Sequence, residues 1–210
     1  MKLLIERGAD VNFEGVRGSA LAKAACKDHP NIVQIRLDNG ADMNLSCGKK
    51  DYFTALEAAA AKGMASMMRI LIDRGADVNL VSTHGTALQG AVWSGRARMV
   101  TLLLDYGADI NFVSGKGTAL GVAVFTNNAD ILQLLIKRGA DFNIIGGVDG
   151  TALASATYLN SCALVSGGPS DPNSPAALVR RWAPINGRRL VHEHHSDNAR
   201  LWRRYQQPRS

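Results

Sequence analysis

A five-residue string, Gly-Ala-Asp-x-Asn, occurs five times along the chain and constrains the fold more than any other feature. Its copies begin at Gly8, Gly40, Gly75, Gly107 and Gly139, in steps of 32, 35, 32 and 32 residues. A second string, Ser/Thr-Ala-Leu, accompanies it once per unit, from Ser19, Thr54, Thr86, Thr118 and Thr151. Two strings locked in register predict a repeat array in which each unit packs on its neighbours.

Each unit carries the signals of two helices. Good N-cap candidates precede the Ala-rich runs, namely Thr54, Thr86, Thr118 and Thr151. The small side chains of these runs allow neighbouring helices to approach closely. A second, strongly apolar run follows and ends at a glycine such as Gly107, which is typical of the left-handed residue that closes a helix. The Gly-rich segment 112–117 then predicts a hairpin-like turn.

Helix, turn, helix and hairpin in about 33 residues resembles the ankyrin repeat, and the resemblance covers roughly residues 1–160. The Gly-Ala-Asp-x-Asn string is highly specific for that family. The first helix departs from the usual Thr-Pro-Leu-His-x-Ala, because residues 86–91 lack both Pro and His. This Thr-Ala-Leu variant is similar to arrays common in large filamentous-fungal proteins. The resemblance implies an all-α ankyrin solenoid with short β-hairpins.

The repeat pattern predicts how the chain is divided. Residues 1–160 form the array: a half repeat, full repeats at 19–53, 54–85, 86–117 and 118–150, and then a broken repeat. A Ser/Gly/Pro-rich linker is expected at 161–175, followed by an Arg-rich degenerate tail at 176–210. Because the chain begins in mid-repeat, we expect a fragment of a longer array or a gene model that starts too late. The tail is either genuine or the product of a frame change or retained intron.

The net charge of +6 does not lie on the array. Residues 1–175 hold 16 basic and 16 acidic side chains, whereas residues 176–210 hold eight arginines and two acids. This distribution disfavours nucleic-acid binding by the array, although the tail leaves that possibility open. Three widely spaced cysteines without a C-x-x-C pair favour a reducing, intracellular and cytoplasmic setting, with the nucleus not excluded. Without a run of 18 apolar residues, no membrane association is expected.

The resemblance implies that the first helices and hairpin tips line a concave face where partners dock. Seven residues after each helix start the chain has Cys26, Ala61, Trp93, Phe125 and Tyr158, so three successive repeats place an aromatic residue at one register. Aromatic side chains in line favour a binding surface, and packing between helices is the alternative. The further candidates for partner binding are Lys62, Ser94 and Thr126 beside this register and Lys49, His84 and Lys116 in the tips.

A rotation argument makes the aromatic register testable. Trp93, Phe125 and Tyr158 lie five residues after Leu88, Leu120 and Leu153, respectively. At about 3.6 residues per turn, five residues correspond to roughly 140° around the helix. We therefore expect the three aromatic side chains to be more exposed than the three leucines.

None of the candidate catalytic or metal-binding motifs has the residues at the spacing that its chemistry requires. The segment 114–118 (Ser-Gly-Lys-Gly-Thr) lacks the first glycine of a phosphate loop, and 192–195 (His-Glu-His-His) is not H-E-x-x-H. The aspartates of the repeated string, one per unit, predict a structural series. We therefore expect no enzyme activity, cofactor or metal, but a module that binds another protein on its concave face. The alternative is a ligand-recognition array from a larger signalling or enzyme chain.

Overall fold

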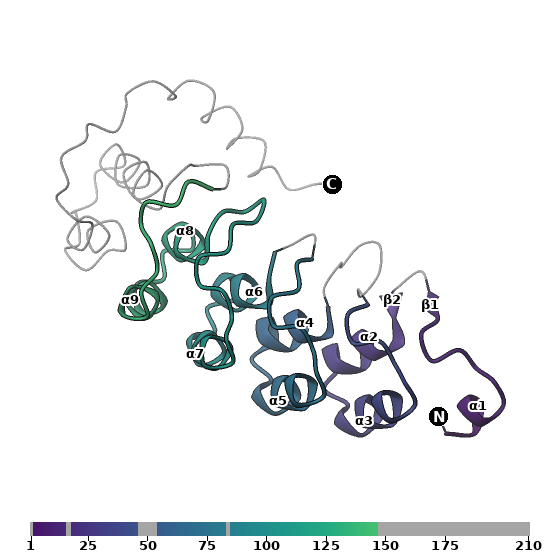
Figure 1. Ribbon diagram of the computed structural model, residues 1–210. Helices are drawn as coiled ribbons and strands as arrows, with labels where there is room; N and C mark the ends of the chain where they lie inside the picture. Colours follow the sequence, from purple (N-terminus) through teal and green to yellow (C-terminus); the bar gives the residue numbers. More distant parts are fainter. Residues whose placement is uncertain (1, 16–17, 46–53, 83–84, 147–210) are drawn as a thin grey trace, which may run out of the picture.

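The computed structural model describes residues 2–15, 18–45, 54–82 and 85–146, which form two parallel rows of helices (Figure 1). The first row consists of α2 (Ala20–Cys26), α4 (Ala55–Lys62), α6 (Ala87–Trp93) and α8 (Ala119–Phe125). The second row consists of α3 (Pro30–Asp38), α5 (Ala65–Asp73), α7 (Ala97–Asp105) and α9 (Ala129–Lys137). Helix α1 (Lys2–Glu6) precedes them at the end of the array.

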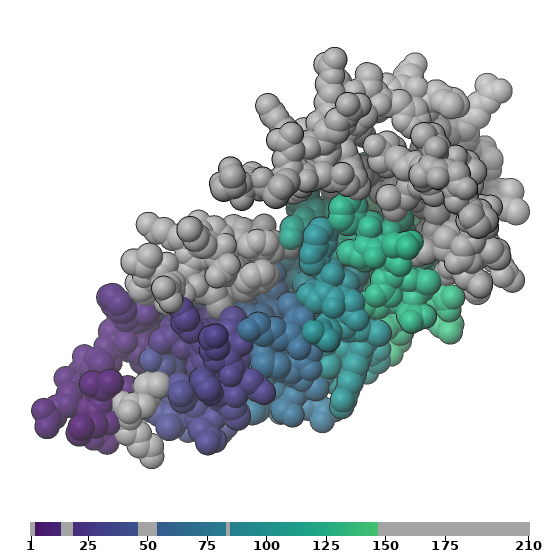
Figure 2. All heavy atoms as spheres, turned by 180° about the vertical axis from the view of Figure 1, so that it is seen from behind, coloured from purple at the N-terminus to yellow at the C-terminus, as the bar shows by residue number. Residues whose placement is uncertain are grey.

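Short hairpins connect the second row to the first row of the next repeat. Strands β1 (Glu14–Gly15) and β2 (Gly18–Ser19) pair antiparallel, and single bridges join Ser82 to Gly85 and Ser114 to Gly117. Seen as spheres, the described residues follow one another along the molecule in the order of the sequence (Figure 2). The predicted all-α solenoid with short hairpins is confirmed.

The helices of the first row begin where the sequence predicts. The side chains of Ser19, Thr54, Thr86 and Thr118 each accept a hydrogen bond from the backbone N–H three residues later. These bonds satisfy amide groups that the helix itself cannot pair. The glycines expected to end the second-row helices, Gly75, Gly107 and Gly139, have φ between +84° and +93°. Thr151, the last predicted N-cap, lies outside the described residues.

Alanines of the first row and leucines of the second row form the core. Ala59, Ala91 and Ala123 are fully buried at the close approach of adjacent first-row helices. In the second row Leu71, Leu103 and Leu135 are equally buried. Burial of one leucine side chain stabilises the fold by roughly 1.5–3 kcal/mol, so each repeat depends on both rows. Leu4 has the same register in α1 but is 63% exposed, since α1 lies at the end of the described array.

The repeated Gly-Ala-Asp-x-Asn string links successive repeats. Within a repeat the aspartate accepts from the amide of the asparagine two residues later, as Asp109 does from Asn111 at 2.9 Å. Between repeats the asparagine side chain accepts from the next aspartate amide, and Asn79 accepts from Asp109 at 2.8 Å. The same Asn79 donates to the carbonyl of Gly107 at 3.2 Å. The aspartates therefore have the structural role that their spacing predicts.

Arg36 interrupts the leucine positions of the second row. It occupies the register of Leu71, Leu103 and Leu135 and is half-buried. Its Nη1 donates to the carbonyl of Val11 at 3.0 Å, but its buried Nε has no hydrogen-bond partner among the described residues. Desolvation by burial lowers the pKa of Arg36 below its ordinary value. A guanidinium at this position therefore costs the fold free energy.

Replacing Arg36 by leucine is expected to raise the free energy of unfolding by ~1 kcal/mol or more. Leucine restores the apolar contact made in the other repeats and removes the unpaired Nε. Chemical denaturation of the two proteins measures the difference. If the midpoint does not rise, the bond to Val11 compensates fully for the desolvation of the guanidinium.

Candidate interaction surface

Two exposed aromatic rings stand side by side on the first row. Trp93, at the end of α6, is 49% exposed, and Phe125, at the end of α8, is 39% exposed. Their ring centroids are 5.4 Å apart and the ring planes differ by 18°, a stacked arrangement. Leu88 and Leu120 are each 1% exposed, so the expected difference in exposure is confirmed for both repeats. Tyr158 and Leu153 lie outside the described residues.

The hairpin residue Lys116 lies against this ring pair. Its Nζ is over the Trp93 ring, 4.9 Å from the centroid. The turn that carries Lys116 is held by a hydrogen bond from the Ser114 amide to the Gly117 carbonyl and by one from the Lys116 amide to the Ser114 hydroxyl. An ammonium over an indole is a favourable contact. The structure thus brings together two candidates, Trp93 and Lys116, that the sequence placed on separate elements.

Three other candidates occupy the position that follows the aromatic register in their repeats, and they have different roles. Lys62 is exposed, but its Nζ donates to the carbonyl of Cys26 at 2.7 Å and so satisfies the C-terminal end of α2. The hydroxyl of Thr126 donates back to the Val122 carbonyl at 3.0 Å. Ser94 is exposed at the end of α6. The tip residues Lys49 and His84, also predicted as candidates, fall outside the described residues.

Beneath Lys116 lies a buried carboxyl group that the sequence reasoning missed. Glu57, in α4, is 1% exposed, and its Cγ lies so close to Gly90 of α6 that a Cβ there would be 3.1 Å away. Among the described residues neither carboxyl oxygen has a hydrogen bond of good geometry. Desolvation by burial raises the pKa of Glu57 to about 7, although the Ser82 hydroxyl, the Thr54 backbone and Lys116 favour its charged form.

The charge of Lys116 is coupled to the same carboxyl group. Desolvation by burial lowers the pKa of Lys116, and the attraction of Glu57 partly opposes that shift. The side chain as a whole is exposed, so the ammonium keeps contact with solvent. Glu57, Lys116 and Trp93 therefore form one electrostatically linked group on the face of the first-row helices.

The next repeat has an uncharged side chain at the register of Glu57. Gln89 has the same register, and its Oε1 accepts from the Thr86 amide at 3.1 Å. Its Nε2 donates to the carbonyls of Phe112 and Gly117 at 3.2 and 2.6 Å. An amide can donate to two carbonyls, whereas an ionised carboxylate cannot donate at all. Comparing the third residue of each first-row helix, which is Ala22, Glu57, Gln89 and Gly121, would have revealed this difference.

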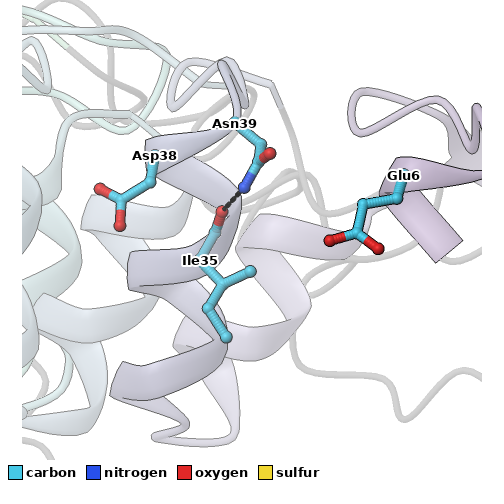
Figure 3. Close-up of a pocket in the computed structure, with 4 residues that line it drawn as sticks. All are labelled: Glu6, Ile35, Asp38 and Asn39. Carbon is cyan, nitrogen blue, oxygen red and sulfur yellow. Dashed lines mark hydrogen bonds between the residues drawn. The ribbon is translucent and has the colours of Figure 1, made fainter. Parts of the chain in front are cut away.

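A shallow hollow lies at the other end of the array, between α1 and α3. It is lined by Glu6, Ile35, Asp38 and Asn39 (Figure 3). The Asn39 side chain donates to the Ile35 carbonyl at 2.6 Å, and Asp38 pairs with Arg74 of α5 at 2.8 Å. The side chains of Asn39 and Asp38 are therefore already engaged in bonds within the array.

In the part of the chain that the structure describes, no three histidine, cysteine or acidic side chains converge as a metal site would require. No helix in the described segments has the length and apolar character needed to cross a bilayer.

Comparison with known proteins agrees with the repeat architecture. The family described as ankyrin repeats (3 copies) matches residues 1–82, 21–114, 59–146 and 88–166, well over half of the chain. Over 48 residues the chain is 46% identical to the ankyrin repeat and KH domain-containing protein mask-1 of Caenorhabditis elegans. That match covers 23% of this chain but 2% of the longer relative. It therefore concerns the repeats and not the whole relative.

Proposed function

Because this chain belongs to the ankyrin-repeat family, whose repeats are generally protein–protein interaction modules, we propose that it binds a partner protein on the concave face of its first-row helices and hairpins. The observation that carries this proposal is the exposed, stacked pair of Trp93 and Phe125. Such rings offer a large apolar area whose loss from water on binding is favourable.

The geometry of the ring pair suits a binding anchor. Stacking holds both rings in one orientation before a partner arrives, so less side-chain freedom is lost on binding. The contact of Trp93 with Lys116 restricts the indole further. The helices below are packed on fully buried residues such as Ala91 and Ala123, which give the pair a rigid base. Specificity would come from the hairpins, of which Lys116 is the described example.

Replacing Trp93 by alanine is expected to weaken partner binding by about 2 kcal/mol and to change the stability of the array little. Much of the indole is already in solvent, so its loss leaves no large cavity. The full chain serves as bait to isolate a partner from cell extract, and titration calorimetry then compares the variants. Tyr106→Ala is the matched control, since Tyr106 is an aromatic residue of the second row with 38% exposure.

The comparison of the two variants decides the proposal. Equal affinities of Trp93→Ala and the unmodified chain would place the partner elsewhere on the molecule. A loss confined to Tyr106→Ala would move the binding face to the second row. Thermal unfolding of both variants verifies that the folded array is what was compared.

A further inference from the structure

The exposed charges of the first-row helices all have one sign. The four helices contain three charged residues, Lys23, Glu57 and Lys62, and of these only the two lysines are exposed. Glu57 is buried, and its raised pKa of about 7 leaves its carboxyl group partly neutral near physiological pH. The exposed Lys116 adds a third ammonium, beside the rings.

The second row has no such bias. Each of α5, α7 and α9 exposes both acidic and basic side chains, namely Arg69 and Asp73, Arg98 and Asp105, and Asp130 and Lys137. Two ion pairs, Arg74 with Asp38 and Arg138 with Asp105, join neighbouring repeats on that side. The excess of positive charge is therefore a property of the first-row helices and the Lys116 hairpin, and not of the described array as a whole.

We propose that the partner is an acidic protein segment that places an apolar or aromatic side chain on the Trp93–Phe125 pair and a carboxylate against Lys116. This inference rests on the proposed function and adds the chemistry of the partner. Charge complementarity supports it, since a carboxylate meets an ammonium in a charge-assisted hydrogen bond. Lys62 and Lys23 extend the positive surface along α4 and α2. A partner segment with acidic residues on one side of its apolar or aromatic side chain would therefore complement this surface.

A protein segment fits this surface better than a nucleic acid does. Single strands bind proteins by stacking bases on free aromatic faces, along a groove that follows the phosphates. Here the Trp93 ring is already stacked with Phe125 and lies under the Lys116 ammonium. A base that stacks on the Trp93 indole would compete with these contacts, whereas an aliphatic side chain can pack on the exposed part of the pair without stacking.

A display library of short random peptides tests the proposal with the full chain as target. The enriched peptides are expected to carry Asp or Glu beside an apolar or aromatic residue. For one such peptide, affinity should fall about tenfold on Lys116→Met or when its acids are replaced by amides. Arg98→Glu, a charge change on the second row, is the control and should alter affinity less than about twofold.

The outcomes separate the inference from the proposed function. Peptides that need Trp93 but carry no acidic residues would overturn the inference and leave concave-face binding in place. Peptides that bind the Trp93→Ala variant as tightly as the unmodified chain would overturn both the inference and the proposed function. A labelled single-stranded oligonucleotide that binds through Trp93 at physiological salt, when acidic peptides do not, would assign the face to nucleic acid. Lys62→Glu serves as a second charge variant if Lys116→Met does not fold.

Discussion

Replacing Glu57 by glutamine is expected to raise the free energy of unfolding by about 2 to 3 kcal/mol at about pH 8.5. The carboxyl group is 1% exposed, and desolvation raises its pKa from 4.5 to about 7. Its ionisation is therefore easier in the unfolded chain than in the folded one. Glutamine keeps the shape of the side chain, cannot ionise, and is the residue that the following repeat has at this register.

The sign of the pH dependence follows from the raised pKa. The stability that protonated Glu57 contributes is fully present below about pH 4.5 and is lost as the pH rises through about 7. Urea unfolding of both proteins between about pH 5 and 8.5 should show curves that diverge with rising pH. Asp73→Asn, which removes an exposed acid of α5, is the control. Parallel curves for Glu57→Gln and the unmodified chain would show that the folded protein holds this carboxylate at no cost.

The reciprocal change, Gln89→Glu, is expected to lower the free energy of unfolding by about 3 kcal/mol at about pH 8. A carboxylate at this position would replace the Nε2 donor with an oxygen facing the carbonyls of Phe112 and Gly117. Part of the loss should be recovered at lower pH, because a protonated carboxyl group can donate one hydrogen bond. Urea unfolding at about pH 8 and at a lower pH measures the loss of stability and its recovery.

Gln34→Glu controls for the change of side chain alone, since Gln34 is exposed on α3. It should leave the free energy of unfolding within about 0.5 kcal/mol of the unmodified value. A Gln89→Glu protein as stable as this control at high pH would mean that the hairpin carbonyls turn away from the new carboxylate. The two carbonyl contacts would then not be what stabilises glutamine at position 89.

The repeat period made most of the fold predictable. Thr54, Thr86 and Thr118 cap helices because their hydroxyls meet local amides, an interaction that depends only on neighbouring residues. Local rules also account for Gly107, whose positive φ closes α7. The exposure of Trp93 and Phe125 followed from helical rotation alone, whereas their role in binding remains a proposal.

The contacts between elements could not be predicted in the same way. The partners of Gln89 are backbone carbonyls of the next hairpin, and a carbonyl has no sequence signature. Lys116 of the hairpin lies over Trp93 of α6, and Gly90 of α6 lies against Glu57 of α4, so the group depends on three elements at once. Glu57 and Gln89 occupy a register whose residue varies between repeats, so the pattern shared by the repeats does not point to it.

The asparagine and aspartate links between repeats have a consequence for how such a chain can change over generations. Asn12 bonds to the amide of Asp42, Asn79 to that of Asp109, and Asn111 to that of Asp141. Because these three junctions use the same donor and acceptor, a duplicated or exchanged unit that forms such a junction meets its new neighbour with the bonds already matched. The group formed by Glu57, Gly90 and Lys116 has no such freedom. Glu57 belongs to the unit 54–85 and the other two residues to the unit 86–117, so separating these two units would break the group. Recombination can lengthen this array at little cost, but it can preserve the charged group beside Trp93 only by moving the two units together.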